Sequence, residues 1–169
     1  MMRDPDLKKR LQYAKKIVKQ GLKNPFYKLI SKETEVGVKT SLVYNKDRAH
    51  LSMKSGYYTI YRQIGKRMEC LYVGKSDHSI HQRVNRWAKG VAGKLRHDEN
   101  HAAALKARRD GVKLSDKIFV KIISMEEVNK IVKEESIRSE PLDEWIAPLL
   151  KSKYNENTFE LSASLEDFF

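Results

Sequence analysis

The sequence predicts an α+β domain in which a small, mainly antiparallel sheet is flanked by helices and preceded by a basic helical extension. Three patterns support this class. A period of two over residues 57–73 predicts a β-hairpin, residues 80–91 carry apolar side chains at helical spacing, and KIFVKIIS at 117–124 is typical of a buried strand. The order of helices, hairpin, helices, strand and helices is typical of the α+β class.

The length and composition favour a single folded domain. The chain has 169 residues, of which 40% are hydrophobic, and this is enough for one core. The one cysteine, Cys70, excludes an internal disulfide and fits a reducing compartment. Neither a membrane span nor a secretory signal is recognisable, so we expect a cytoplasmic protein without a membrane partner. We divide the chain into an extension at 1–50, a domain at 51–158 and an acidic tail at 159–169.

Positive charge is concentrated in the first two thirds of the chain. The formal net charge is +12, and residues 1–110 hold 26 basic against 10 acidic side chains. A field of this size and asymmetry attracts a polyanion, and nucleic acid is the partner we expect. A basic protein without such a partner is the alternative that charge alone leaves open.

The extension begins with a predicted helix. Asp4 is a predicted N-cap, Pro5 suits the first helical position, and Gly21 suits the end. The inward face carries Leu7, Leu11, Ala14 and Val18, and the outward face carries lysines, among them Lys8, Lys15 and Lys16. These lysines either contact DNA phosphates or belong to a helix that only caps the core.

A second short helix is predicted to start at Asn24-Pro25, with Phe26, Leu29 and Ile30 facing inward. Residues 31–50 are polar and mixed, and no regular structure is predicted for them. Both segments would complete a helical extension outside the sheet.

The hairpin brings chemically useful side chains together. Its strands are predicted at 57–64 and 68–73, around a turn at Gly65-Lys66. A three-residue loop at 64–66 would place Tyr58 opposite Tyr72, with Lys75 nearby, whereas a two-residue loop would shift the pairing by one. An ordinary aromatic cross-strand pair is the alternative interpretation.

The helix after the hairpin carries a candidate phosphate ligand. Ile80, Val84, Trp87 and Val91 form its predicted buried face. At about 100° per residue, Arg83 lies about 60° from the centre of that face and Arg86 about 120°. Arg83 can therefore bind a phosphate beside the hairpin with both ends of its guanidinium. Arg86 points outward and either contacts a phosphate or is simply solvated, and Lys89 is assigned to DNA contact with it. Further helices are predicted at 99–109, 126–136 and 142–153, the last with Pro148 inside it.

The segment from Gly56 to Val91 resembles the GIY-YIG nuclease signature. It has a Gly-x-Tyr strand ending at Tyr58, a Tyr-x-Gly strand starting at Tyr72, Lys75-Ser76 after it, and Arg83 eleven positions beyond Tyr72. The family commonly has Ile or Val where this chain has Tyr57, and a His where it has Trp87.

The C-terminal part of the resemblance supplies a metal ligand. Glu144 and Asn155 resemble the family's metal-binding Glu and later Asn, so the likeness covers roughly residues 56–157. An alternative register around Ala147-Pro148 puts Ile146 in the Glu position and leaves Glu140 as the fallback ligand.

The resemblance implies a metal-dependent DNA endonuclease. Glu144 would hold one Mg²⁺ or Mn²⁺, and Arg83 would neutralise the phosphate. Tyr58 would be the general base, its pKa lowered by Lys75, Arg83 and the metal, with Tyr72 hydrogen-bonding beside it and Asn155 orienting its neighbours.

Three functions are compatible with the sequence. The first is an endonuclease of restriction, phage or mobile-element type, which would act as a homodimer and cut duplex DNA at selected sites. A non-catalytic DNA-binding module with the same fold is the second function, and an RNA-binding protein is the third. Metal-dependent cleavage separates the first from the others, and preference for duplex DNA over RNA separates the first two from the third.

Overall fold

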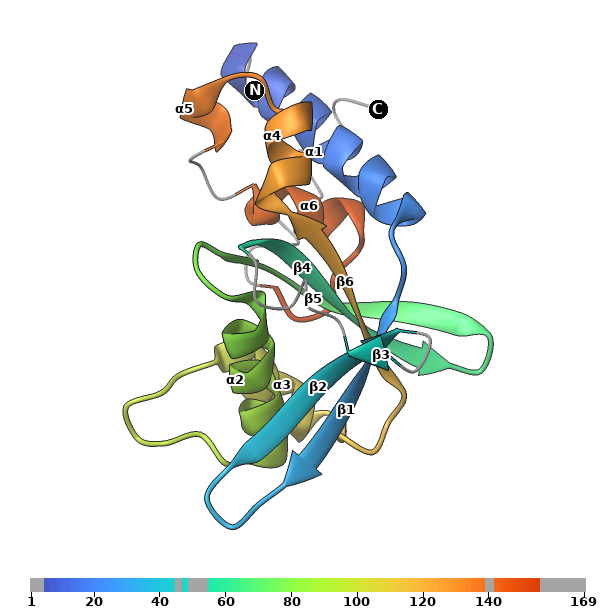
Figure 1. Cartoon of the computed structure of the whole chain (residues 1–169), viewed down its shortest axis with the longest axis vertical. Coiled ribbons are helices and arrows are strands. Elements are labelled where there is room, and N and C mark those ends of the chain that lie inside the picture. Colours follow the sequence, from blue (N-terminus) through green and yellow to red (C-terminus); the bar gives the residue numbers. More distant parts are fainter. Residues whose placement is uncertain (1–4, 45–46, 49–54, 139–141, 156–169) are drawn as a thin grey trace.

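The computed structural model describes residues 5–44, 47–48, 55–138 and 142–155, and its centre is one antiparallel sheet (Figure 1). The six strands lie in the order β3-β2-β1-β6-β4-β5, and every neighbouring pair is antiparallel. Their bounds are β1 Tyr27–Glu33, β2 Val38–Tyr44, β3 Asp47–Arg48, β4 Gly56–Ile64, β5 Arg67–Ser76 and β6 Ile118–Ser124. The predicted α+β class is confirmed.

Helices cover both faces of the sheet. In Figure 1, α1, α4, α5 and α6 gather at one end of the molecule, and α2 and α3 lie on the other side of β4 and β5. Their bounds are α1 Pro5–Lys23, α2 Ile80–Ala92, α3 Ala102–Arg109, α4 Met125–Ile131, α5 Glu135–Arg138 and α6 Asp143–Leu149. Within the described residues no helix has the length and apolar character needed to span a membrane.

Helix α2 forms for the reasons that the sequence indicates. Ser79 caps its start by accepting a hydrogen bond from the Gln82 N–H, and Gly93 ends it in the left-handed conformation at φ 73°. All four residues of the predicted inward face are buried, at 0–2% exposure. This face packs against β4, and so fixes the side chains that α2 carries beside the hairpin.

The sheet separates two apolar clusters. The first joins α2 and α3 to Tyr58 and to inward residues of β1, β2 and β6. The second joins α1, α4, α5 and α6 to the opposite face, through Tyr57 and Val73. Adjacent residues of β4 therefore serve different layers, as the period of two requires.

Residues 24–44 correct two predictions. The segment expected to be a second helix is β1, and part of the segment expected to be irregular is β2. Tyr27 pairs with Val120 of β6, so this segment extends the central sheet. The spacing of Phe26, Leu29 and Ile30 fits a helix, but the burial alternates strictly from Tyr27 to Ile30, as in a strand with one solvated face.

Smaller corrections concern element ends. Helix α1 starts at Pro5 as predicted but continues past Gly21, which is buried close to the Ile123 side chain, to Lys23. The helix expected at 126–136 is divided into α4 and α5, and the one expected at 142–153 ends at Leu149, one residue after Pro148. The predicted N-cap Asp4, the fallback ligand Glu140 and the acidic tail at 159–169 lie outside the described residues.

Candidate functional site

The β4–β5 hairpin brings Tyr58 and Tyr72 onto one face through an irregularity in β5. The turn has two residues, since Ile64 pairs with Arg67, and from there the pairing is regular up to Tyr61 and Cys70. Ile60 then pairs with Tyr72, so Leu71 is an extra residue, a β-bulge. Tyr58 consequently lies opposite Gly74, and its ring centroid is 6.2 Å from that of Tyr72. The two phenols are therefore diagonal neighbours. They do not lie directly opposite each other, as the register with a three-residue loop had predicted.

Gly74 is required because the ring of Tyr58 lies directly on its backbone. A Cβ atom at position 74 would be 2.4 Å from both Cζ and the hydroxyl oxygen of Tyr58. No side chain fits at such a distance. Gly74 of the Tyr-x-Gly strand therefore leaves the space that the ring of Tyr58 occupies.

The chain after α6 covers the outer edge of β5. The Asn155 side chain accepts a hydrogen bond from the Val73 N–H and donates one to the Val73 carbonyl, both at 2.8 Å. The Tyr154 N–H donates to the Leu71 carbonyl at 3.0 Å. These bonds satisfy backbone groups that a free edge would leave open. Asn155 thus fixes the strand that carries Tyr72.

A cavity of about 410 Å³ opens where the hairpin, α2, α3 and α6 meet. It gathers all six residues proposed from the sequence as catalytic, and it includes Arg86 as well. The sequence-derived members are Tyr58, Tyr72, Lys75, Arg83, Arg86, Glu144 and Asn155. Four further polar residues that were not predicted as site residues also line the cavity, together with three alanines, namely Asn100, His101, Asp143 and Tyr154 with Ala102, Ala103 and Ala147. Residues far apart in the chain therefore form one polar site.

Three cationic side chains line this cavity. Lys75 is 14% exposed and lies 3.5 Å from a carboxylate oxygen of Asp77. Arg83 is exposed and makes no ion pair within the described ranges. Arg86 is the less exposed of the two arginines, opposite to the predicted order. Such a group of cations suits a phosphate.

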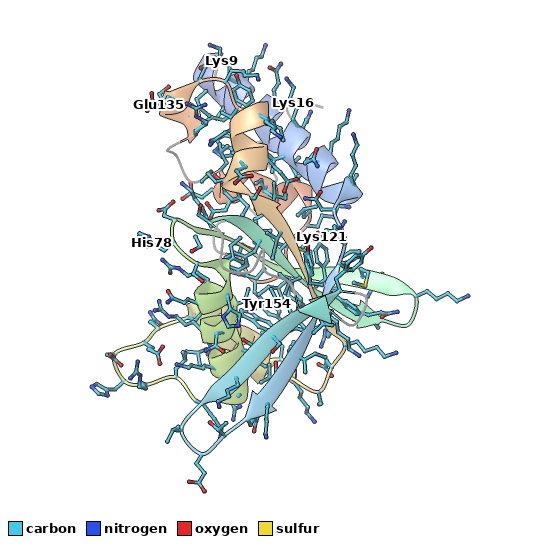
Figure 2. The ribbon with its side chains drawn as sticks, in the orientation of Figure 1. Lys9, Lys16, His78, Lys121, Glu135 and Tyr154 are labelled. Atoms are coloured by element: carbon cyan, nitrogen blue, oxygen red, sulfur yellow. The ribbon has the colours of Figure 1, made fainter. Side chains whose placement is uncertain are left out.

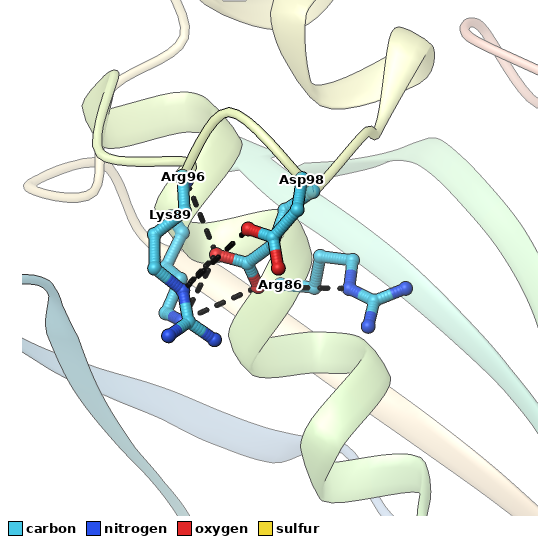
Figure 3. Close-up of polar contacts among 5 residues, drawn as sticks. Arg86, Lys89, Arg96 and Asp98 are labelled. Atoms are coloured by element: carbon cyan, nitrogen blue, oxygen red, sulfur yellow. Dashed lines mark hydrogen bonds and ion pairs between the residues drawn. The ribbon is translucent and has the colours of Figure 1, made fainter.

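The loop before α3 explains why Arg86 is partly covered. Glu99 lies among Arg86, Lys89 and Arg96, with N···O distances of 3.9, 3.4 and 3.4 Å (Figure 3). A backbone hydrogen bond from Arg96 and the charge of Lys89 hold the pKa of Glu99 below its usual value. Lys89, expected to contact phosphate, is therefore engaged within the protein.

Two adjacent carboxylates occupy the start of α6. Tyr57 positions this helix from β4, because its hydroxyl accepts a hydrogen bond from the Leu142 N–H at 3.0 Å. Glu144 is exposed at the cavity, whereas the buried Oδ1 atom of Asp143 has no hydrogen-bond partner. Burial raises the pKa of Asp143, and the neighbouring charge of Glu144 raises it further. A buried, unpaired carboxylate oxygen beside a second carboxylate is the feature here that a cation would satisfy.

The alternative metal register fits the structure poorly. Ile146 is 1% exposed and belongs to the apolar cluster beneath α6, so its position does not face the cavity. Among the described residues there is no group of three or more metal-binding side chains. The site therefore offers a pair of carboxylates, and Mg²⁺ commonly binds through one or two such groups while keeping its waters.

The protein's own groups raise the pKa of Tyr58, so the expected lowering would have to come from the metal. Tyr58 is 2% exposed, and its burial raises the pKa of the phenol. Tyr72 raises it further, and the lowering effects of Arg83 and Arg86 are smaller. The phenol therefore keeps its proton at neutral pH, because desolvation outweighs the nearby positive charges.

His101 completes the wall behind Tyr72. Its ring meets that of Tyr72 edge-on, with centroids 4.9 Å apart. Burial and the charge of Arg86 lower the pKa of His101 to about 4, so the imidazole is neutral at pH 7. Nδ1 accepts a hydrogen bond from the Ala104 N–H, and the proton must then reside on Nε2. His101 is a hydrogen-bond donor at this site.

The lysines of α1 lie away from the cavity. Lys8 and Lys16 are exposed and Lys15 is partly buried, and none of them lines the site. Figure 2 shows Lys16 on α1 in the helical end of the molecule, well separated from Tyr154 of the cavity. Their proposed contact with DNA would have to occur at a separate surface.

Comparison with known proteins adds no assignment. No family model, no curated protein and no solved structure matches the chain.

Proposed function

We propose that this protein is a metal-dependent endonuclease of the GIY-YIG type that hydrolyses phosphodiester bonds in duplex DNA. One observation carries the proposal. Six residues selected from the sequence resemblance, spread over nearly one hundred positions, line a single polar cavity. An unrelated set of tyrosine, lysine, arginine, glutamate and asparagine residues has no reason to converge in this way.

The cationic residues supply the site for the scissile phosphate. Arg83 approaches from α2 and Lys75 from the end of β5. Within the described ranges Arg83 makes no ion pair, and the ion pair of Lys75 is with the exposed Asp77. A phosphate between them gains charge-assisted hydrogen bonds, which strengthen as negative charge develops in the transition state. Arg86 adds a third positive group, whose charge Glu99 partly offsets.

Asp143 and Glu144 would hold the divalent cation, Mg²⁺ or Mn²⁺. The fit rests on the unpartnered Oδ1 atom of Asp143 and on the exposed carboxylate of Glu144 in the same cavity. When bound, such a cation polarises the phosphate and lowers the pKa of a coordinated water. Tyr57 has a positioning role, since its hydroxyl fixes the first turn of the helix that bears both carboxylates.

The tyrosines act as hydrogen-bond donors in this proposal. Because Tyr58 keeps its proton, its hydroxyl would donate to a phosphate oxygen or orient the attacking water. Tyr72 packs between Tyr58 and the neutral His101, so the three rings form one wall of the site. The role of general base therefore passes from Tyr58 to solvent or to a bound water.

Cleavage of supercoiled plasmid tests the proposal. We expect the wild type to nick or linearise plasmid in Mg²⁺ and to lose this activity in chelator. Glu144→Gln should be inactive, whereas Glu135→Gln, an exposed acid on α5, should retain the wild-type rate. Intact plasmid with the wild type in both Mg²⁺ and Mn²⁺ would contradict the proposal and favour a binding module.

A further inference from the structure

The β1–β2 hairpin presents a basic face that no other described part of the protein covers. Lys28 and Lys32 of β1 and Lys39 of β2 are exposed, and Ile30 between them is 46% exposed. Lys32 and Lys39 are directly paired across the strands. We call this outward surface, formed by Lys28, Ile30, Lys32, Lys39, Ser41 and Val43, the ribbon face.

The opposite face of the same hairpin carries the apolar residues that belong to the core. Leu29, Val38 and Leu42 are buried against α2 in the first apolar cluster. The period of two separates the faces, so the lysines cannot turn inward without a change of register. The ribbon face is therefore a fixed feature of the folded chain.

The charge on the ribbon face has no internal counterpart. None of its three lysines forms an ion pair with any residue in the described part of the chain. Glu33, the acid at the end of β1, pairs with Val38 and so belongs to the other face. Like charges directly across two strands are destabilising, so the pair of Lys32 and Lys39 favours an external anion.

The ribbon is held rigidly against the helix that carries the candidate site. His81 Nε2 lies 2.8 Å from the Thr40 carbonyl, and the Thr40 hydroxyl donates to Asn85 Oδ1 at 2.9 Å. At the tip of the hairpin, the Lys94 ammonium donates to the Thr34 carbonyl. Helix α2 thus contacts the ribbon through His81 and Asn85, and it places Arg83 and Arg86 at the cavity.

A groove of about 670 Å³ continues this surface between β2 and α2. Among the described residues, β3 pairs with β2 only at Val43 and Tyr44, at the far end of β2 from the residues that line the groove. Its lining includes Lys32 and Lys39 together with Gln82 and Asn85 of α2. Lysines suit phosphates and the exposed amide of Gln82 suits a base edge, so the groove offers both kinds of group at one place.

We propose that the ribbon face lies along duplex DNA, with Lys28, Lys32 and Lys39 on its phosphates, and that it sets the position of the strand entering the cavity. The proposal rests on the proposed nuclease function. A two-stranded antiparallel ribbon has the width that the DNA major groove accepts. It replaces the lysines of α1 as the main DNA-contact surface outside the cavity.

Two triple variants with equal loss of charge test this assignment. The ribbon variant is Lys28→Ala, Lys32→Ala and Lys39→Ala, and the matched control is Lys8→Ala, Lys16→Ala and Lys19→Ala on α1, all exposed in the wild type. Binding to a fluorescent duplex is measured by anisotropy in chelator, so that no cleavage occurs, over a range of salt concentrations. Thermal melts confirm that both variants fold, since exposed lysines contribute little to stability.

We expect the ribbon variant to bind at least tenfold more weakly and its salt dependence to fall by roughly two to three units of slope. The α1 control should change affinity less than threefold, and the triple Lys→Arg ribbon variant should keep the wild-type slope. Equal weakening by both triple variants, or none by the ribbon variant, would overturn the proposal.

Two further outcomes separate this proposal from the nuclease function. If the wild type cleaves plasmid and the ribbon variant binds DNA as the wild type does, only the ribbon assignment fails. If the wild type neither binds duplex DNA nor cleaves it, both fail. A larger effect of the ribbon variant on double-stranded RNA than on DNA would assign the face to RNA and overturn the proposal.

Discussion

Tyr58 and Tyr72 share one face of the sheet, with ring centroids 6.2 Å apart, because β5 contains one residue more than β4 requires. The extra residue is Leu71, which is fully buried. Without it, the two-residue turn would pair Tyr72 with Thr59 and direct its ring to the other face of the sheet. The candidate site thus depends on a bulge, a feature that commonly re-aims a side chain next to a functional site.

The contact between Gly74 and Tyr58 leads to a stability prediction. Gly74→Ala should lower the free energy of unfolding by about 1–3 kcal/mol, because a Cβ atom there meets the phenol ring. In a Tyr58→Ala background the same change should cost much less. Urea titration of the four proteins in this cycle measures the coupling.

Gly37→Ala is the matched control for that cycle. A Cβ at this position would only make ordinary contact with Lys89, at 3.8 Å, and the variant should be about as stable as the wild type. Additive effects of the Gly74 and Tyr58 changes would show that the ring and the glycine are not in the contact described.

Asp143 should oppose folding at neutral pH. Its pKa is raised in the folded state, so its contribution is most favourable below the usual value of 3.8 and is lost as pH rises through the folded-state value. Asp143→Asn should therefore melt higher than the wild type at pH 7, by a few degrees at most, and the difference should shrink towards pH 4. Asp98→Asn, at an exposed loop acid, should show no such trend. A wild type that melts higher than Asp143→Asn at pH 7 would contradict the assigned direction.

Mg²⁺ should reverse this order of stability. A cation that binds only the folded protein raises the melting temperature as its concentration increases. We expect Mg²⁺ to stabilise the wild type and to have little effect on Asp143→Asn or Glu144→Gln, as measured by thermal melts. Equal stabilisation of all three proteins would place any metal site elsewhere.

Glu99 should weaken DNA binding by neutralising Arg86, Lys89 and Arg96. Glu99→Gln should tighten binding to duplex DNA by roughly two- to tenfold and steepen its salt dependence, because more cations can then contact phosphates. Glu69→Gln is the control, since Glu69 pairs with Arg62 outside the cavity lining. Unchanged affinity in Glu99→Gln would mean that this cluster only supports the loop.

The protonated state of Tyr58 leads to a prediction about the pH dependence of cleavage. With burial raising its pKa, Tyr58→Phe should lower the rate but leave the shape of the rate–pH profile between about pH 6.5 and 9 unchanged. The measurement is the single-turnover cleavage rate of both proteins at each pH. Loss of the alkaline rise in Tyr58→Phe alone would restore Tyr58 as the general base.

Local periodicity predicted most of the site-bearing elements. The apolar face of α2 follows from its helical spacing, and the strands β4, β5 and β6 follow from their runs of apolar and β-forming residues. The bulge at Leu71 was not predictable, since alternation along β5 cannot show where one residue is inserted. Strand β1 was missed because Phe26, Leu29 and Ile30 also fit the spacing of a helix, and the segment is too short for the two periods to be distinguished.

The candidate site was predicted where it followed a motif and missed where it depended on tertiary packing. Tyr58, Tyr72 and Arg83 were selected from their spacing and do line the cavity. His101 comes from a loop that only the packing of α2 and α3 brings behind Tyr72. Asp143 had one available signal, its position next to Glu144, but its buried and unpaired oxygen appears only in three dimensions.

The most direct test of the central claim is the single-turnover cleavage rate of one labelled DNA duplex, compared with the affinity for that duplex in chelator. We predict that Arg83→Ala and Glu144→Gln each lower the rate by at least a hundredfold. Their affinities should stay within about tenfold of the wild type, because neither group supplies most of the DNA-binding surface. Cleavage by Glu144→Gln at the wild-type rate would show that the cavity is not the site of phosphodiester hydrolysis.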